Sequence, residues 1–201
     1  MDKTIEYYEN NAADFASSTI DVPMESTQER FLERIENGAY ILDFGCGSGR
    51  DTKYFLSKGY RVDATDGSEE LCKIASKNTG INVRRLLFTE LCEKDLYDAI
   101  WACSSILHLD RRTLAEVFDK MHSSLKDNGI VYTSFKYGEF EGYRNGRYFI
   151  DFTKETFSSF LSECGLFSLV DEWVTSDARP GRGDEKWLNL IIRKKPYERL
   201  R

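Results

Sequence analysis

Three closely spaced glycines, Gly45, Gly47 and Gly49, follow an apolar run that starts at Ile41 and contains one carboxylate, Asp43. An apolar run of this kind is typical of a buried strand in a parallel sheet, and the glycines break it abruptly. Because glycine has no Cβ, a backbone built from it can pass close to a ligand. Helical spacing resumes after Gly49, and the N-terminus of the helix that it predicts would present free N–H groups and a positive dipole end to the same ligand. The stretch therefore predicts a strand, a turn and a helix that bind a nucleotide-type ligand.

The spacing of the glycines distinguishes between classes of nucleotide site. In the dinucleotide fingerprint G-x-G-x-x-G the third glycine would fall on Arg50, but here it comes one residue earlier, at Gly49. A P-loop needs Lys and then Ser or Thr after its last glycine, and Arg50-Asp51 is a different pair. Asp43 would repel a pyrophosphate but could accept hydrogen bonds, direct or through water, from a cationic amino-acid ligand. A glycine-rich turn without a ligand is the alternative interpretation.

The run from Ile41 to Gly49 resembles motif I of the class I S-adenosylmethionine-dependent methyltransferases, in which apolar residues and an acid precede h-G-x-G-x-G. The resemblance implies S-adenosylmethionine as cofactor and S-adenosylhomocysteine as product. Within the family the chain is most similar to small bacterial methyltransferases of the tellurite-resistance and ubiquinone-methylation type. The likeness covers nearly the whole chain, but only motif I and the acid at position 66 are specific. The loop residues that we expect to contact the cofactor are Asp43, Gly45, Cys46, Gly47 and Gly49.

A second carboxylate, Asp66, follows the predicted strand Tyr60 to Thr65 and lies about 20 residues beyond the glycine turn. An acid at this place can accept two hydrogen bonds from ribose hydroxyls. Asp63 is the chemical rival, but it lies away from the strand end. Capping of the next helix is the alternative role for Asp66, although Ser68 or Gly67 could fill it. We expect Asp66 and Gly67 to contact the cofactor.

The ends of the next two predicted strands supply further cofactor contacts. The family usually has an acid at the end of the third strand, where it meets the adenine amine, but this chain has Phe88. This departure from the family pattern leaves the adenine contact open: Phe88 could stack on or flank the purine while backbone groups near Thr89 recognise its edge, and Glu90 is a further candidate contact. The fourth strand leads into a segment similar to the family's motif IV. There Ala102 and Ser104 are expected to face the sulfonium and its methyl group.

His108 follows this segment and titrates in the range that suits a general base. We predict a catalytic role for it, with packing of the loop before the next helix as the alternative. Methyl transfer from a sulfonium is an in-line displacement, for which positioning alone can supply about 7 to 11 kcal/mol. A soft nucleophile such as a thiolate needs no base. The sequence therefore leaves the acceptor atom open.

Two helices are predicted before the first strand, one over residues 5–15 and one that begins near Glu25 and ends at Asn37-Gly38. The resemblance implies that the aromatic N-terminal segment caps the cofactor pocket, and that Tyr7 or Tyr8 helps to close it. Of these two we assign Tyr7 to the cofactor site.

From Ala39 onward strands and helices alternate, which predicts an α/β fold. We expect a single Rossmann-like domain with a mostly parallel seven-stranded sheet, helices on both faces and N-terminal capping helices. The chain is divided into a helical cap (1–38), a cofactor-binding core (39–135) and an acceptor side (136–201). The predicted strands are Tyr40 to Phe44, Tyr60 to Thr65, Ile81 to Leu87, Asp98 to Cys103, Gly129 to Phe135, Leu166 to Val174 and Lys186 to Ile192. The predicted helices of the core and acceptor side are Arg50 to Ser57, Ser68 to Lys77, Arg111 to Leu125 and Lys154 to Glu163.

Two segments rich in arginine and aromatic residues follow strand ends and are expected to cover the acceptor. The first, Lys136 to Asp151, shows no clear period, and the second surrounds Arg182. Arginine beside aromatic rings suits an anionic, partly planar or apolar acceptor. Pairing with Asp151, Asp177, Asp184 or Glu185, which would only order the loops, is an equal alternative. The residues predicted to bind the acceptor are Tyr137, Arg144, Arg147, Tyr148 and Arg182.

The net charge and the cysteine pattern limit the classes of molecule that the protein is expected to bind. A net charge of −6 and a pI near 5.1 disfavour DNA binding, although residues 193–201 are basic. Five widely spaced cysteines without a C-x-x-C pair indicate a reduced, cytoplasmic protein with no metal site. No apolar run approaches the roughly 20 residues that span a bilayer, so we expect no membrane partner.

The sequence thus predicts a methyltransferase that acts on a small-molecule acceptor. An RNA methyltransferase acting on tRNA and a non-catalytic S-adenosylmethionine-binding protein are the alternatives. The oligomeric state is not indicated by any feature of the sequence.

Overall fold

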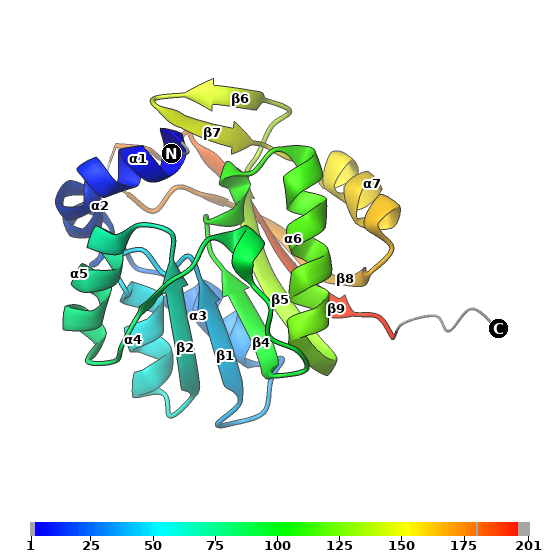
Figure 1. Ribbon diagram of the computed structural model, residues 1–201. Helices are drawn as coiled ribbons and strands as arrows, with labels where there is room; N and C mark the ends of the chain where they lie inside the picture. The colour runs from blue at the N-terminus through cyan, green and yellow to red at the C-terminus, as the bar shows by residue number, and fades with distance from the viewer. Residues whose placement is uncertain (1–2, 180, 197–201) are drawn as a thin grey trace.

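The computed structural model describes residues 3–179 and 181–196. Its seven-stranded sheet consists of β1 (Tyr40–Phe44), β2 (Arg61–Asp66), β3 (Arg84–Arg85), β4 (Tyr97–Ala102), β5 (Leu125–Lys136), β8 (Phe167–Ser176) and β9 (Lys186–Lys194). The strand order is β3-β2-β1-β4-β5-β9-β8, and β9 runs antiparallel to both of its neighbours (Figure 1). The mostly parallel, Rossmann-like sheet predicted from the alternation of elements is confirmed.

Helices cover both faces of this sheet (Figure 1). On one face lie α3 (Glu25–Leu32), α4 (Arg50–Ser57) and α5 (Glu69–Thr79), and on the other α6 (Arg111–Ser124) and α7 (Lys154–Cys164). On the first face Phe31 of α3 packs edge-on against Trp101, whose indole stacks 4.0 Å from the ring of Tyr132. Because β1 and β4 are buried on both faces, their sequences are mostly apolar, and in β5 the same holds for the buried part from Ile130 to Tyr132.

The N-terminal cap differs from the prediction of one helix over residues 5–15. It consists of two helices, α1 (Lys3–Asn10) and α2 (Ala12–Thr19), which meet at Asn11. The Asn11 side chain donates a hydrogen bond of 2.8 Å to the Tyr7 carbonyl, and its φ of −120° is not helical. An asparagine side chain that competes for the backbone in this way favours a break in the helix. The predicted strand from Ile81 to Leu87 is also shorter, and only the two residues of β3 pair with β2.

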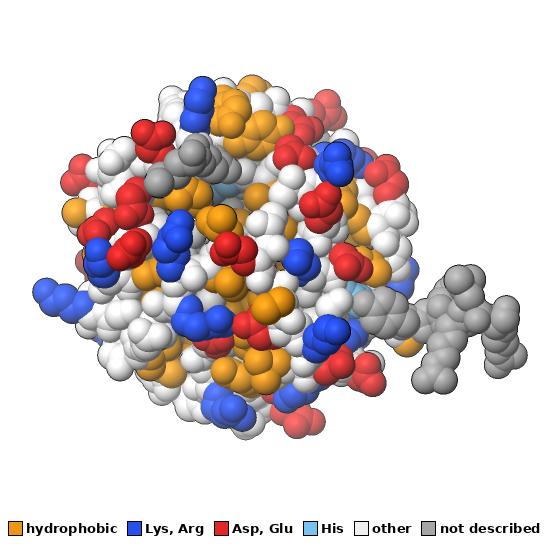
Figure 2. All heavy atoms as spheres, in the orientation of Figure 1, with side chains coloured by type: hydrophobic (Ala, Val, Ile, Leu, Met, Phe, Trp, Pro, Cys, Tyr) orange, Lys and Arg blue, Asp and Glu red, His pale blue; other side chains and the backbone are white. Residues whose placement is uncertain are grey.

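Residues 136–151, which were predicted to be irregular, contain a hairpin of β6 (Glu141–Arg144) and β7 (Arg147–Ile150). The strands are joined by Asn145-Gly146, both with positive φ (52° and 78°), as a two-residue type I′ turn requires. The hairpin lies beside α1, at the end of the sheet to which the parallel strands point (Figure 1). Its outer surface is apolar (Figure 2), with Phe140 41% and Tyr143 58% exposed.

Two short 3₁₀ helices follow strand ends, η1 (Phe88–Glu90) and η2 (Ile106–His108). Within the described residues, no helix is long and apolar enough to cross a membrane. The basic segment 193–201 extends beyond the described part of the chain, so Arg199 and Arg201 lie outside it.

Candidate active site

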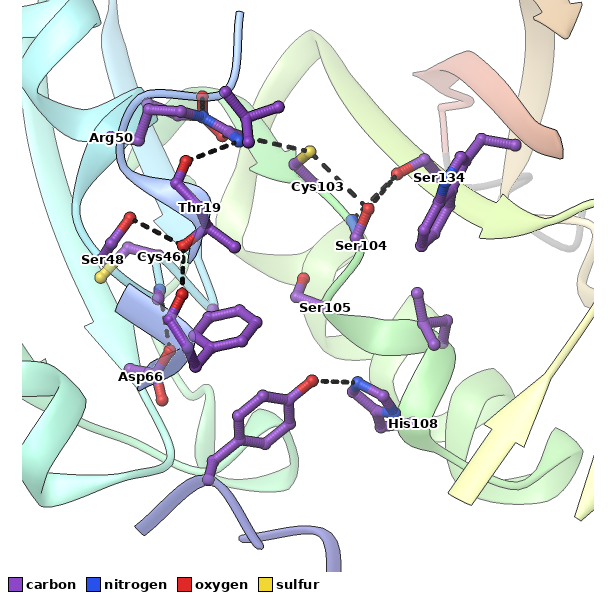
Figure 3. Close-up of a pocket in the computed structure, with 18 of the residues that line it drawn as sticks. Thr19, Cys46, Ser48, Arg50, Asp66, Cys103, Ser104, Ser105, His108 and Ser134 are labelled. Carbon is purple, nitrogen blue, oxygen red and sulfur yellow. Dashed lines mark hydrogen bonds and ion pairs between the residues drawn. The ribbon is translucent and has the colours of Figure 1, made fainter. Parts of the chain in front are cut away.

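A cavity of about 700 Å³ lies at the carboxyl ends of β1, β2, β4 and β5, and residues of α1 and α2 contribute to its wall. Figure 3 shows Cys46, Ser48 and Asp66 on one side of it, and Ser104, Ser134 and His108 on the other. The predicted site residues that line the cavity are Gly45, Cys46, Gly47, Asp66, Gly67, Phe88, Thr89, Ser104, His108, Arg147 and Arg182. Residues from six separate segments of the sequence therefore share one space.

The glycine turn after β1 is built so tightly that side chains would not fit. Gly45 has a φ of +86°, and a Cβ there would lie 2.5 Å from the Cβ of Ser105. Gly47 has a φ of +55°, and its Cβ would lie 3.0 Å from the Phe15 ring of α2. Gly49 serves a different purpose, because it does not line the cavity and its Cβ would meet Thr79 of α5 at 2.7 Å. The first two glycines let Ser105 and Phe15 lie close to the turn, and the third lets α4 and α5 approach each other.

Asp66 presents a partly buried carboxylate to this turn. The Gly47 N–H donates to its Oδ2 at 2.9 Å and the Ser68 N–H donates to its Oδ1 at 2.9 Å. A carboxylate has about four acceptor positions, so two remain for a ligand. Burial raises the pKa of Asp66 to about 6. Helix capping is done by Ser68, whose hydroxyl accepts from the N–H of Leu71 at 3.2 Å.

The rival carboxylate, Asp63, is engaged elsewhere. It accepts a hydrogen bond of 2.7 Å from Arg84 and another of 2.7 Å from the Tyr97 hydroxyl. It does not line the cavity. This arrangement supports the assignment of ribose recognition to Asp66, which stays a prediction.

Four of the predicted cofactor residues lie outside the cavity wall: Tyr7, Asp43, Gly49 and Ala102. The Tyr7 ring packs 4.5 Å from the Arg147 guanidinium, and Ala102 is fully buried in β4. Asp43 is buried behind the turn, where it accepts a hydrogen bond from the Thr52 hydroxyl of α4. Burial and the neighbouring carboxylate of Asp51 raise the pKa of Asp43 to about 8. Asp43 is therefore protonated at pH 7, although it was expected to act as a carboxylate.

Three of the predicted acceptor residues also lie outside the cavity wall. Tyr137 is 40% exposed, and Arg144 forms an ion pair with Asp151. The Tyr148 hydroxyl donates to Glu141 at 2.8 Å. For Arg144 the structure thus shows the loop-ordering alternative, while Arg147 and Arg182 remain on the cavity wall.

His108 is held in a defined tautomer by its neighbours. Its Nδ1 lies 2.6 Å from the Tyr148 carbonyl, which can only accept, so Nδ1 carries the proton. Nε2 then accepts from the Tyr8 hydroxyl at 2.8 Å. The Tyr8 oxygen in turn accepts from Arg147 at 3.2 Å. Burial lowers the pKa of His108 to about 4, so the imidazole is neutral at pH 7.

The wall opposite the glycine turn contains two residues that were not predicted, Ser134 of β5 and Asn189 of β9. It also contains Lys136, Arg179 and Trp187, which belong to the two segments that were expected to cover the acceptor. Arg179 forms an ion pair with Asp177. Burial alone would raise the pKa of Asp177, but the hydrogen bonds from Arg179 outweigh burial and lower this pKa to about 2. A usable signal was present, since Ser134 and Asn189 are polar positions inside otherwise apolar strands. Both are buried, and the Tyr132 hydroxyl donates to Asn189 at 2.7 Å.

The two halves of the cavity differ in chemistry. The half next to β1 and β2 offers a glycine turn, a carboxylate with free acceptor positions, and Phe88, whose ring is edge-on to Phe44 at 4.8 Å. These groups fit a nucleoside. The half next to β5 and β9 offers cations, an indole and amide or hydroxyl groups, which fit a second molecule. Ser104 and Ser105, after β4, lie between the two halves (Figure 3).

Comparisons with known proteins show what this chain is similar to. A profile of the methyltransferase domain matches residues 41–129. A human N-terminal Xaa-Pro-Lys N-methyltransferase 1 is 33% identical over 129 residues, which cover 57% of this chain and 56% of the human protein. An uncharacterized protein of Methanocaldococcus jannaschii is 29% identical over 110 residues, which cover 50% of this chain. The match spans only 29% of that archaeal protein, so this chain covers less than two thirds of either relative.

A solved structure extends the likeness over almost the full chain. The 1,6-didemethyltoxoflavin-N1-methyltransferase of Burkholderia thailandensis, with bound 1,6-didemethyltoxoflavin and S-adenosylhomocysteine, is 25% identical with a TM-score of 0.72. The alignment covers 95% of this chain and 90% of the other. The glycine turn, the carboxylate after β2 and the strand order are thus accompanied by likeness in sequence and fold. The chain is therefore similar to S-adenosylmethionine-dependent methyltransferases, in sequence over residues 41–129 and in fold over almost its whole length.

Proposed function

We propose that this protein transfers the methyl group of S-adenosylmethionine to a small molecule bound in the same cavity. The observation that carries the proposal is that one cavity of about 700 Å³ joins the glycine turn to a separate wall of cations and aromatic residues. When bound, S-adenosylmethionine supplies an electrophilic methyl group on a sulfonium. Asp66 would hold the ribose, Phe88 would flank the adenine, and the turn at Gly45 and Gly47 would face the amino-acid part.

The residues between the two halves of the cavity position the partners and do not compete with the acceptor. The Ser104 N–H donates to the Ser134 hydroxyl at 2.9 Å, which fixes the backbone after β4 at a φ of 53°. Burial raises the pKa of the Cys103 thiol to about 12, so this thiol stays protonated and is a poor nucleophile. The cap formed by α1 and α2 places Tyr8 and Phe15 in the cavity wall, where they would cover part of a bound cofactor. Such positioning is the main catalytic requirement of an in-line displacement.

The relatives differ in the acceptor for which they are named, so the choice between a small molecule and a peptide rests on the cavity wall. The Burkholderia enzyme binds a small heterocycle, while the human relative is named for a protein N-terminus. Among the described residues, four cations line the acceptor half of the cavity, namely Lys136, Arg147, Arg179 and Arg182. Cations placed in this way would repel a protonated N-terminus followed by lysine and attract an anionic group. We therefore favour a small acceptor.

Cofactor specificity gives the first prediction. Calorimetry should detect binding of S-adenosylmethionine and S-adenosylhomocysteine but not of NAD, because Gly49 comes one residue too early for a dinucleotide turn. Asp66→Ala should weaken S-adenosylhomocysteine binding by ~1.5 to 3 kcal/mol, the cost of losing hydrogen bonds to a charged group. Asp63→Ala is the matched control and should bind as the wild type does. NAD binding, or a loss confined to Asp63→Ala, would contradict the assignment.

The class of acceptor gives the second prediction. On the face shown in Figure 2, Lys and Arg alternate with Asp and Glu, which does not favour docking of a polyanion. After incubation with methyl-tritiated S-adenosylmethionine, the label should appear in a nuclease-treated, protein-free metabolite extract and not in purified tRNA. Labelling of tRNA, together with RNA affinity that falls steeply with salt, would favour the RNA alternative. Cofactor binding with no label in either fraction would indicate a non-catalytic protein.

A further inference from the structure

Arg147 differs from the other cations of the acceptor half in having no carboxylate partner. Lys136 and Arg182 approach Glu185, and Arg179 pairs with Asp177. In the described part of the chain no Asp or Glu oxygen lies within 4.0 Å of Arg147. Arg85 also lacks a carboxylate, but it donates to the Gly67 carbonyl on the cofactor side. Arg147 is thus the cation of the acceptor half whose charge the described residues leave uncompensated.

The surroundings of Arg147 hold its guanidinium at the cavity without using up its donors. The guanidinium lies 4.5 Å from the Tyr7 ring centroid and 5.2 Å from that of Phe149. Its Nη1 donates to the Tyr8 oxygen at 3.2 Å, while its Nε is buried and has no hydrogen-bond partner in the described structure. Leaving a charged donor buried and unpaired costs free energy. Of the five N–H donors of Arg147, Nε is buried and one Nη1 donor is used by Tyr8, which leaves the other Nη donors for a ligand in the cavity that Arg147 lines.

The hydrogen bonds of Tyr8 and His108 exclude these two residues as competing partners. The His108 Nδ1–H donates a hydrogen bond to the Tyr148 carbonyl, so Nε2 accepts a hydrogen bond from the Tyr8 hydroxyl. The Tyr8 hydroxyl therefore has no proton left to donate to an acceptor molecule. Neutral His108 also adds no charge beside Arg147. At this end of the cavity the remaining N–H donors of Arg147 are the groups that can recognise an acceptor.

On the basis of the methyl transfer proposed above, we propose that Arg147 binds the acceptor in its ionised form. The acceptor would be a planar molecule with an acidic O–H or heteroaromatic N–H that loses its proton to solvent on binding. A cation close to such a group lowers its pKa, and the planar guanidinium can contact two acceptor atoms at once. The ionised atom then forms a bond to the methyl carbon, and the electron pair of the broken C–S bond stays on sulfur. The negative charge of the acceptor and the positive charge of the sulfonium are both neutralised, and no proton remains to be removed from the product.

The probe for this inference is 4-nitrophenol, because its phenolate and its phenol differ in visible absorbance. It is titrated with pH in the presence of saturating S-adenosylhomocysteine. Wild-type protein should bind the phenolate saturably and lower the probe's pKa by at least one unit relative to free probe. Arg147→Gln should weaken binding at least tenfold and remove the shift. Arg147→Lys should keep part of it, because the charge stays and the planar fork is lost.

Two measurements on the same samples separate the possible failures. Arg112→Gln removes an arginine charge from the exposed surface of α6, where the side chain is 90% exposed, and should leave probe binding unchanged. The affinity of each variant for S-adenosylhomocysteine reports whether the pocket is intact. If S-adenosylhomocysteine does not bind, the proposed function fails. If it binds normally but the probe binds as neutral phenol, binds equally to Arg147→Gln or does not bind saturably, only the role of Arg147 is overturned.

Discussion

Gly45→Ala is expected to abolish detectable binding of S-adenosylhomocysteine while the protein still folds. The added Cβ would lie 2.5 Å from the Cβ of Ser105 and 3.1 Å from Cζ of Phe88. Two walls of the cavity would then have to move at the point where the backbone approaches the cofactor. The φ of +86° adds a conformational cost of about 1 to 2 kcal/mol for any residue with a Cβ. Calorimetry should show a loss of affinity of at least a hundredfold.

Gly59 provides a matched control for this variant. It has the same φ of +86°, but a Cβ added there would have no neighbouring atom within 4 Å, and Gly59 does not line the cavity. Gly59→Ala should therefore carry the same backbone cost, seen as a lower melting temperature, and bind S-adenosylhomocysteine as the wild type does. Equal affinity in the two variants would show that strain, and not the close approach at Gly45, determines binding. Should Gly45→Ala fail to fold, Gly47→Ala, whose Cβ would meet only the Phe15 ring at 3.0 Å, gives a milder test.

The cofactor half of the site could be predicted from sequence because its chemistry is local. The types and spacing of the turn residues, with an acid after the next strand, determine which groups meet, and Gly45, Gly47 and Asp66 do line one cavity. The bounds of β1 and α4 agree with the prediction for the same reason. Gly49 was grouped with the other two glycines because sequence does not distinguish approach to a ligand from approach to a neighbouring helix.

The acceptor half could not be predicted to the same extent because it depends on pairing between distant residues. Arg144 and Arg147 lie opposite each other in the hairpin, yet only Arg144 reaches Asp151. That difference follows from the turn and from the position of α1. Neither could be derived from the number and spacing of the arginines in the sequence. One local signal was overlooked, since Asn145-Gly146 between alternating residues is a strong hairpin indicator. With that turn, β6 and β7 could have been predicted.

The burial of Asp43 was likewise beyond sequence reasoning and leads to the last prediction. Its partners come from α4, where Thr52 donates to it and Asp51 lies nearby. Asp51 keeps its charge because burial, which would raise its pKa, is outweighed by Arg50, so the pKa of Asp51 is lowered. Asp43 is left as the carboxyl that stays protonated. A neutral Asp43 cannot offer the carboxylate that was expected to meet a cationic ligand.

Asp43→Asn should make the protein's stability less dependent on pH. In the unfolded chain Asp43 titrates near 3.8, whereas in the fold it titrates near 8. Between these values the folded state holds one proton more than the unfolded state. The free energy of unfolding therefore falls as pH rises through this window, by about 1.4 kcal/mol per unit. Urea unfolding at pH 5 and pH 8 should show a decrease in the free energy of unfolding that is roughly 3 kcal/mol larger for the wild type than for Asp43→Asn.

The pKa of Asp66, about 6 in the fold, is also higher than in the unfolded chain. Asp66 makes this contribution in the wild type and in Asp43→Asn alike, so the difference between the two proteins reports on Asp43. Asp51→Asn supplies the contrast, since it leaves Arg50 buried without its carboxylate and should destabilise the protein by about 3 to 5 kcal/mol. Asp43→Asn should also retain the wild-type affinity for S-adenosylhomocysteine at pH 7, because it replaces one neutral group by another. Parallel unfolding curves for wild type and Asp43→Asn, or a tenfold loss of cofactor affinity in the variant, would show instead that Asp43 acts as a carboxylate.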